Sequence, residues 1–164
     1  MNYITDYIKK YYPLAKAAGE RFNINPLVVL AQLSVESDWG RSYSARVRKN
    51  FAGIIATKQS KPNEFWSGKS SPSTNNKLKT PLTFRIYDTE QDSFMDFARL
   101  ISSNYKTAAA ASFDMEEYAR LISISPYIDE SNGDSRPAYQ KGIITRAKQI
   151  LQYGKEIINE KKKE

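Results

Sequence analysis

The sequence contains neither cysteine nor histidine among its 164 residues. Without cysteine there is no disulfide framework, no thiolate nucleophile and no zinc–thiolate site. Without histidine, Ser-His-Asp triads, imidazole bases and histidine-ligated metals are excluded as well. Any chemistry that this chain performs must therefore come from carboxylates, hydroxyls, tyrosines or lysines.

Long hydrophobic runs are also missing. The longest strongly apolar run, residues 27–31, is far shorter than the roughly 20 residues that cross a bilayer. The first six residues lack the basic start and the apolar centre of a secretion signal, so no secretion route is visible in the chain. We therefore expect no membrane insertion.

Acidic residues are fewer than basic ones, with 18 Asp and Glu against 25 Lys and Arg, which gives a net charge of +7. This balance favours a polyanionic partner such as nucleic acid, an anionic membrane surface or the bacterial wall. The basic residues are spread along the chain, however, and no RNA-binding or zinc-finger signature is present, so we expect no nucleic-acid partner. The one dense basic run lies in residues 161–164, which we interpret as a solvated tail.

With 40% hydrophobic and 26% charged residues, the 164-residue sequence has the composition of a soluble globular protein, and we expect a single domain over residues 1–160. Apolar spacing predicts a helix from Ile4 to Tyr11, followed by Pro13 either as a kink or as the start of a second helix. Asn25 and Pro26 are a helix N-cap and first residue, and the apolar helix after them is predicted to be buried and central.

The stretch from about residue 50 to residue 87 has a different character. Short β-prone pieces at 51–55, 64–66 and 82–87 are predicted to be strands, and the polar segment 67–80 a mobile loop. Capping signals at 89–92 and at Asp114 then start further helices, and a last helix is predicted over about 137–158. The expected fold class is mainly α (α+β), with one small β insertion.

Glu36 stands at the end of the apolar helix and is the leading candidate for chemistry. We expect Trp39 to shield one side of it from water, which would raise the carboxyl pKa towards that of a general acid. Gly40 permits a sharp exit of the chain. On spacing alone, Glu36 is equally compatible with an ordinary solvated residue near a helix end.

Residues 25–40 resemble the N-P-x-V-x-x-A-Q-x-x-x-E-S-G/D-W-G segment of flagellar-type peptidoglycan glucosaminidases, glycoside hydrolase family 73. Further segments are similar to that family's N-L-F-G-I, W-x-G, F-R-x-Y and A-Y-x-x-x-I motifs, namely residues 50–54, 66–68, 84–87 and 138–143. The resemblance runs in order through residues 12–151. It implies a lysozyme-like fold, in which a helical lobe and a small β lobe flank a saccharide groove.

By the same resemblance, Glu36 matches the catalytic acid, and no metal or organic cofactor is needed. The residues that we assign to substrate binding are Trp39, Asn50, Trp66, Tyr87 and Tyr139. Among these, Tyr87 and Tyr139 match aromatic positions that face the groove in the family. With 11 tyrosines in the chain, an ordinary core or surface role for both stays open.

Two departures from the family pattern matter. Many members carry a second acidic residue about a dozen positions before F-R-x-Y, but residues 71–76 contain no carboxylate. Glu64 is the nearest upstream acid and our candidate for that role, with the N-acetyl oxygen of the substrate as the alternative. The family's aromatic-small-Thr-Asp-Pro segment is also absent, because residues 122–126 read I-S-I-S-P and an insertion-like stretch follows.

The resemblance predicts a monomeric peptidoglycan hydrolase that cuts glycan strands on the GlcNAc side, in the periplasm or cell wall. A muramidase or lytic transglycosylase on the same fold is a second hypothesis, since one acidic Glu serves all three. A catalytically weak wall-binding module is the third, and the missing β-lobe acid favours it.

Overall fold

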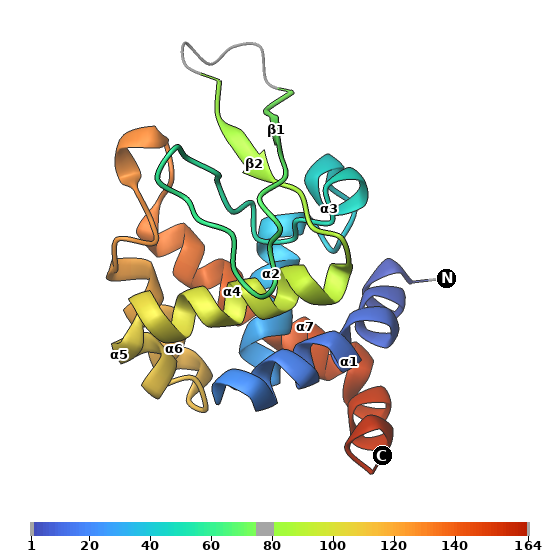
Figure 1. Ribbon diagram of the computed structural model, residues 1–164. Coiled ribbons are helices and arrows are strands. Elements are labelled where there is room, and N and C mark those ends of the chain that lie inside the picture. Colours follow the sequence, from blue (N-terminus) through green and yellow to red (C-terminus); the bar gives the residue numbers. More distant parts are fainter. Residues whose placement is uncertain (1, 75–80, 164) are drawn as a thin grey trace.

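The computed structural model describes residues 2–74 and 81–163 (Figure 1). The elements in chain order are α1 (Tyr3–Phe22), α2 (Pro26–Ser37), α3 (Tyr43–Val47), β1 (Ser70–Pro72), β2 (Thr83–Arg85), α4 (Glu90–Asn104), α5 (Lys106–Ala110), α6 (Met115–Ile124), the 3-10 turn η1 (Glu130–Asn132) and α7 (Arg136–Lys162). Most of the chain is helical, and the two short strands project from one side of the helices (Figure 1).

Helix α2 is the central element of the helical lobe, packed against α1 and α7. It begins as the sequence predicts, because the Asn25 side chain accepts a 3.0 Å hydrogen bond from the Leu27 amide and Pro26 is the first helical residue. Helix α1 is a single helix with Pro13 inside it, so Pro13 does not start a second helix. The Tyr7 hydroxyl of α1 donates a 2.7 Å hydrogen bond to the Leu30 carbonyl of α2.

The chain leaves α2 through three consecutive left-handed residues: Asp38, Trp39 and Gly40 have φ of 50°, 59° and 77°. The last of them requires glycine, because a Cβ on Gly40 would lie 3.2 Å from Tyr11 and 3.3 Å from Phe51 in a backbone conformation that strains other residues. The sharp exit predicted from Gly40 is therefore present. It reverses the chain directly after the turn that carries the candidate acid.

The β lobe is smaller than predicted. Strands β1 and β2 pair antiparallel with Ser71 opposite Phe84, and residue 55 adds only an isolated bridge to Phe84. The prediction of a strand at 64–66 is wrong, because the Asn63 side chain accepts hydrogen bonds from the next backbone amides and folds this piece into a turn. Strand β1 lies inside the segment predicted as a loop, of which residues 75–80 lie outside the described residues.

The later helices start close to their predicted caps. The Thr89 side chain accepts a 3.0 Å hydrogen bond from the Asp92 amide and begins α4, and Asp114 caps α6. Helix α7 runs to Lys162, so the first part of the predicted basic tail is helical. No helix within residues 2–74 and 81–163 is both long and apolar enough to cross a membrane.

Candidate active site

The Glu36 side chain lies in the last turn of α2, where the first turn of α7 meets it. The Tyr139 hydroxyl of α7 donates a short hydrogen bond to Glu36 Oε1, although 103 positions separate the two residues. Ser135 caps α7 by accepting from the Ala138 amide at 3.3 Å, which places Tyr139 in the first turn. Glu36 is partly buried, with some of its surface still open to solvent.

Further hydrogen bonds connect the Glu36–Tyr139 pair to two buried polar side chains. The Gln32 amide donates a 3.0 Å hydrogen bond from Nε2 to the Tyr139 hydroxyl, and Gln32 Oε1 accepts a short hydrogen bond from the Tyr118 hydroxyl of α6. Gln32 and Tyr118 are both fully buried. We call the four residues Tyr118, Gln32, Tyr139 and Glu36 the Glu36 hydrogen-bond chain.

The pKa of Glu36 is raised from 4.5 to about 7. Burial is the largest cause, because it penalises the charged carboxylate. The hydrogen bond from Tyr139 acts in the opposite direction, and the negative charge of Asp134 adds to the increase. Near neutral pH, a substantial fraction of Glu36 is thus protonated and able to donate a proton.

Three tyrosine rings extend from the carboxyl group across the surface of the helical lobe. The Tyr139 and Tyr127 ring centroids are 6.1 Å apart, and those of Tyr127 and Tyr105 are 5.5 Å apart in an edge-on arrangement. All three side chains are partly exposed. Burial raises the pKa of each phenol, so the rings are neutral at physiological pH.

Glu64 does not lie beside Glu36. Its carboxylate forms a two-pronged ion pair with Arg21, at 3.1 and 2.8 Å, which lowers the Glu64 pKa, and it is exposed. Arg21 is at the end of α1, next to the start of α2, whereas Glu36 is in the last turn of α2. Within the described part of the chain, no hydrogen bond or ion pair joins Glu64 to Glu36, and Glu64 is not among the groups that shift the Glu36 pKa. The second carboxylate considered from the sequence is thus paired with Arg21 of α1.

Trp39 lies in the core, where it packs against α1 and α7. Its side chain is 6% exposed and packs edge-on against Tyr7 at 5.4 Å, with the Arg146 guanidinium over its ring at 4.6 Å. After the left-handed exit from α2, residue 39 contacts α1 through Tyr7 and α7 through Arg146. Trp39 thus anchors the end of α2 in the core.

Two further predicted substrate-binding residues hold the β lobe together. The Asn50 amide is 1% exposed and hydrogen bonds to the backbone of Ile54 and Arg85. Trp66 is 3% exposed, donates from its indole to the Lys69 carbonyl at 2.8 Å, and stacks under the Arg85 guanidinium at 4.2 Å. Both side chains face the interior of the lobe.

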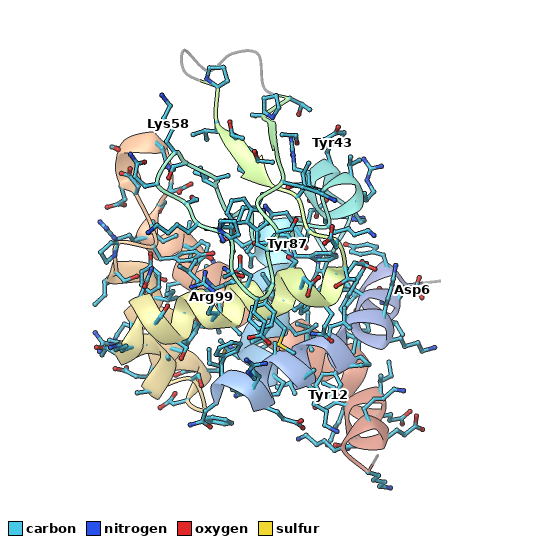
Figure 2. All side chains as sticks on the ribbon, in the orientation of Figure 1. Asp6, Tyr12, Tyr43, Lys58, Tyr87 and Arg99 are labelled. Atoms are coloured by element: carbon cyan, nitrogen blue, oxygen red, sulfur yellow. The ribbon has the colours of Figure 1, made fainter. Side chains whose placement is uncertain are left out.

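Tyr87 lies at the junction between the β lobe and α4, near the middle of the molecule (Figure 2). Its buried hydroxyl donates a 2.5 Å hydrogen bond to Asp96, which also pairs with Arg85 and Arg99. Of the five predicted substrate-binding residues, Tyr139 is the one that forms a hydrogen bond with Glu36. The other four occupy core positions.

Sequence reasoning missed several neighbours of Glu36. Gln32 stands four residues before Glu36, a spacing that places both on one face of a helix and was a usable signal. No local signal pointed to Tyr118, Tyr127 or Asp134, because only the packing of α6 and the segment before α7 brings them close. Among the described residues, no three Asp or Glu side chains gather as a metal cluster would require.

The model of the glucosaminidase family, described as mannosyl-glycoprotein endo-beta-N-acetylglucosaminidase, matches residues 12–152. The chain belongs to the glucosaminidase family. Members of this family are glycoside hydrolases, so this chain is a glycoside hydrolase. The matched residues include all four residues of the Glu36 hydrogen-bond chain.

Two curated relatives of this glucosaminidase are peptidoglycan hydrolases named FlgJ. The protein from Vibrio parahaemolyticus is 28% identical over 129 residues, which cover 74% of this chain and 41% of the relative. The protein from Pseudomonas aeruginosa is 22% identical over 160 residues, which cover 90% of this chain and 37% of the relative. The chain thus spans about two fifths of the length of these relatives.

Solved structures show the same fold. The glycoside hydrolase domain of Salmonella typhimurium FlgJ superimposes with a TM-score of 0.73 at 20% identity and covers 99% of this chain and 96% of that domain. The catalytic domain of the autolysin Auto from Listeria monocytogenes gives 0.70 at 20% identity, covering 93% and 88%. The expected mainly α, lysozyme-like fold with a small β lobe is confirmed.

Proposed function

We propose that this glucosaminidase is a peptidoglycan hydrolase that cuts β-1,4 bonds on the GlcNAc side of glycan strands, with Glu36 as the general acid. The observation that carries the proposal is the environment of the Glu36 carboxyl group, which raises its pKa. Its carboxyl group has a pKa of about 7, is partly open to solvent and accepts a hydrogen bond from Tyr139. The names of the FlgJ relatives support peptidoglycan as the substrate.

In the proposed reaction, protonated Glu36 donates its proton to the glycosidic oxygen while the bond from that oxygen to the anomeric carbon breaks. The positive charge that develops on the sugar requires a nucleophile or a nearby anion. We propose that the acetamido oxygen of the substrate attacks the anomeric carbon and forms a bicyclic intermediate. Water then opens this intermediate, with ionised Glu36 accepting the proton and returning to its starting state.

The substrate-assisted route is supported by the position of Glu64. Its carboxylate is paired with Arg21 in the last turn of α1, and it is not among the groups that shift the Glu36 pKa. Among the described residues, Asp134 is the acid whose negative charge raises the Glu36 pKa, and it is exposed. If a protein carboxylate replaces the acetamido group, Asp134 is better placed for it than Glu64.

The partly exposed rings of Tyr105, Tyr127 and Tyr139 are our proposal for one wall of the glycan site. Sugar rings present C–H groups on their faces and pack well against flat aromatic side chains, while tyrosine hydroxyls supply polar contacts. Their arrangement away from the acid gives a strand several sugars long a continuous contact. We expect action in the periplasm or cell wall, where peptidoglycan lies, by a monomer.

The deciding experiment is digestion of purified sacculi by the wild-type protein and by Glu36→Gln, with mass spectrometry of the released fragments. We expect new GlcNAc reducing ends from the wild type and a rate loss of about 10²–10⁴-fold for the variant, the usual cost of removing a general acid. Activity within tenfold of the wild type would overturn the role of Glu36. Reducing-end MurNAc would instead indicate a muramidase, its anhydro form a lytic transglycosylase, and no fragments a wall-binding module.

A second experiment tests whether the acetamido group of the substrate or a protein carboxylate stabilises the positive charge on the sugar. With substrate assistance, Glu64→Gln costs less than tenfold in rate, since it breaks only an exposed ion pair. A thiazoline analogue of GlcNAc then inhibits more strongly than GlcNAc itself, because it resembles the bicyclic intermediate. A Glu64→Gln protein with almost no turnover and unchanged wall binding would contradict this route.

A further inference from the structure

Helix α2 is apolar along most of its length, yet it carries a fully buried amide one turn before Glu36. A buried amide is unfavourable unless its hydrogen bonds are satisfied. Gln32 satisfies them only with two tyrosine hydroxyls from other helices, Tyr118 of α6 and Tyr139 of α7. Three helices therefore meet at this one side chain.

The Tyr118 hydroxyl determines which way the Gln32 amide faces. Tyr118 is fully buried, and Gln32 Oε1 is the acceptor for its proton. If the amide were rotated by 180°, an N–H would face the hydroxyl and the Tyr118 proton would lose its acceptor, which is costly in the interior. Nε2 therefore faces Tyr139, and the Tyr139 oxygen accepts from it at 3.0 Å.

This arrangement determines the direction of the Tyr139 proton. Because the Tyr139 oxygen already accepts from Gln32, its own proton is directed to Glu36 Oε1. When Glu36 is protonated, Oε1 is occupied as an acceptor, so the acidic proton resides on Oε2. We infer that Tyr118 and Gln32 are positioning residues that orient the Tyr139 hydroxyl and thereby place the proton for the substrate on Glu36 Oε2. This inference rests on the proposed role of Glu36.

The groups that act electrostatically on Glu36 come from three parts of the described chain. Tyr139 lies on α7, Tyr118 on α6, and Tyr127 and Asp134 on the segment between these helices. Of these, Tyr139 lowers the pKa of Glu36 by hydrogen bonding and Asp134 raises it by its charge. Loss of the oriented Tyr139 hydrogen bond therefore raises the pKa of Glu36.

The chain offers a matched pair of variants. Tyr7 and Tyr118 are both fully or almost fully buried and both donate to α2, but Tyr7 donates to the Leu30 backbone and has no contact with the Glu36 hydrogen-bond chain. Each Tyr→Phe change removes one buried hydrogen bond from the same helix. Only Tyr118→Phe releases the Gln32 amide to rotate.

We would measure the pKa of Glu36 from its side-chain carboxyl ¹³C shift, together with kcat and KM on soluble peptidoglycan fragments across pH. For Tyr118→Phe we expect the pKa, and the alkaline limb of the rate profile with it, to rise by about 0.5–1 unit. We expect kcat to fall about three- to tenfold with KM unchanged, since Tyr118 is too deeply buried to touch substrate. Tyr7→Phe should leave all three quantities within error of the wild type.

Gln32→Met provides a second variant of similar shape, and we expect it to raise the pKa less than Tyr118→Phe does, because methionine removes the donor to the Tyr139 oxygen but adds no strong competing acceptor for the Tyr139 proton. An unchanged pKa in both folded variants, or an equal change in Tyr7→Phe, would overturn the inference. The ¹³C titration needs no turnover, so it tests the positioning role separately from the proposed function. An inactive Glu36→Gln with an unshifted Tyr118→Phe pKa would leave the proposed function intact and reject only this inference.

Discussion

Two carboxylates in this protein, the partly buried Glu36 and the fully buried Asp96, both accept a hydrogen bond from a tyrosine hydroxyl and yet have pKa values shifted in opposite directions. Glu36 accepts from Tyr139 and forms no ion pair with any Lys or Arg of the described chain. Asp96 accepts from Tyr87, and it also pairs with Arg85 at 2.9 Å and Arg99 at 2.8 Å. One site lies between α2 and α7, the other between the β lobe and α4.

The difference shows that the partners of a carboxylate decide whether the effect of burial on its pKa prevails or is outweighed. Burial raises the pKa of both groups. At Asp96 the hydrogen bonds from Tyr87 and Arg99 and the charges of the two arginines outweigh burial, so the pKa lies below the ordinary value. At Glu36 nothing of that strength opposes burial, and the pKa reaches about 7. An ionised carboxylate can join two lobes, while a protonated one can act as an acid.

The largest expected effect comes from neutralising the paired carboxylate. Asp96→Asn should lower the free energy of unfolding by about 3–5 kcal/mol at pH 7, because it leaves the charges of Arg85 and Arg99 without their buried partner. Urea unfolding measures this. The control is Asp88→Asn, which breaks only the exposed pair with Lys69 and should cost less than about 1 kcal/mol. Equal losses for the two variants would contradict the comparison.

The pH dependence of this effect has a definite sign. The folded-state pKa of Asp96 is lowered, so its stabilising contribution is complete above the ordinary aspartate pKa of 3.8. The contribution is lost as the pH falls through the lowered folded-state value. The stability difference between the wild type and Asp96→Asn should therefore shrink in strongly acidic solution.

Neutralising the Glu36 carboxylate, in contrast, should stabilise the protein. Ionising Glu36 in the folded state is unfavourable because its pKa is raised from 4.5 to about 7. The cost is absent below pH 4.5 and complete above pH 7. Glu36→Gln should therefore raise the free energy of unfolding by up to about 3 kcal/mol at pH 8 and leave it unchanged at pH 4. A variant less stable than the wild type at pH 8 would contradict this account.

Removing the hydroxyl of Tyr139 or of Tyr87 should have different effects, one on the pH dependence of the rate and the other on stability. Tyr139→Phe should move the alkaline limb of the rate profile up by about one pH unit, because it removes the hydrogen bond that favours ionised Glu36. Tyr87→Phe should leave this limb in place and lower the free energy of unfolding by about 1.5–3 kcal/mol, the usual worth of a hydrogen bond to a charged group. A limb shift in Tyr87→Phe would show that the two sites are coupled.

The smallest expected effect concerns Asp134, an exposed residue whose charge raises the pKa of Glu36. Asp134→Asn should lower the alkaline limb by about 0.2–0.4 pH unit at low salt. In 1 M salt the shift should vanish, because the screening length there is about 3 Å. A rate loss above about 100-fold would instead identify Asp134 as the second carboxylate of the reaction and contradict the substrate-assisted route.

Local chemistry in the sequence predicted a large part of the helical lobe. The caps at Asn25, Thr89 and Asp114 act over two or three residues, and so they are readable without any knowledge of the packing. The position of Glu36 at the end of a buried helix follows from the same local pattern. The strands were predicted poorly, since β1 and β2 are three residues each and depend on their partners more than on their own composition.

The roles of the aromatic side chains were decided by tertiary structure. Trp39 was expected beside Glu36 from a separation of three residues, but the left-handed exit from α2 turns it into the core. Glu64 stood as the nearest upstream acid in the sequence, yet it forms an exposed ion pair with Arg21 near the end of α1. Neither outcome could be read from spacing, because each depends on where another helix ends.

The sequence by itself determined that these 164 residues offer no cysteine or histidine for catalysis or metal binding, and that the leading candidate acid lies at the end of the central helix. Only the tertiary structure decided which of the two carboxylates, Glu36 or Asp96, holds a proton near neutral pH. Tyr139 reaches Glu36 across 103 positions of sequence, and no arginine does so, whereas two arginines reach Asp96. Charge interactions act through space over a few ångströms, so their effect on a pKa depends on the fold that brings the groups together.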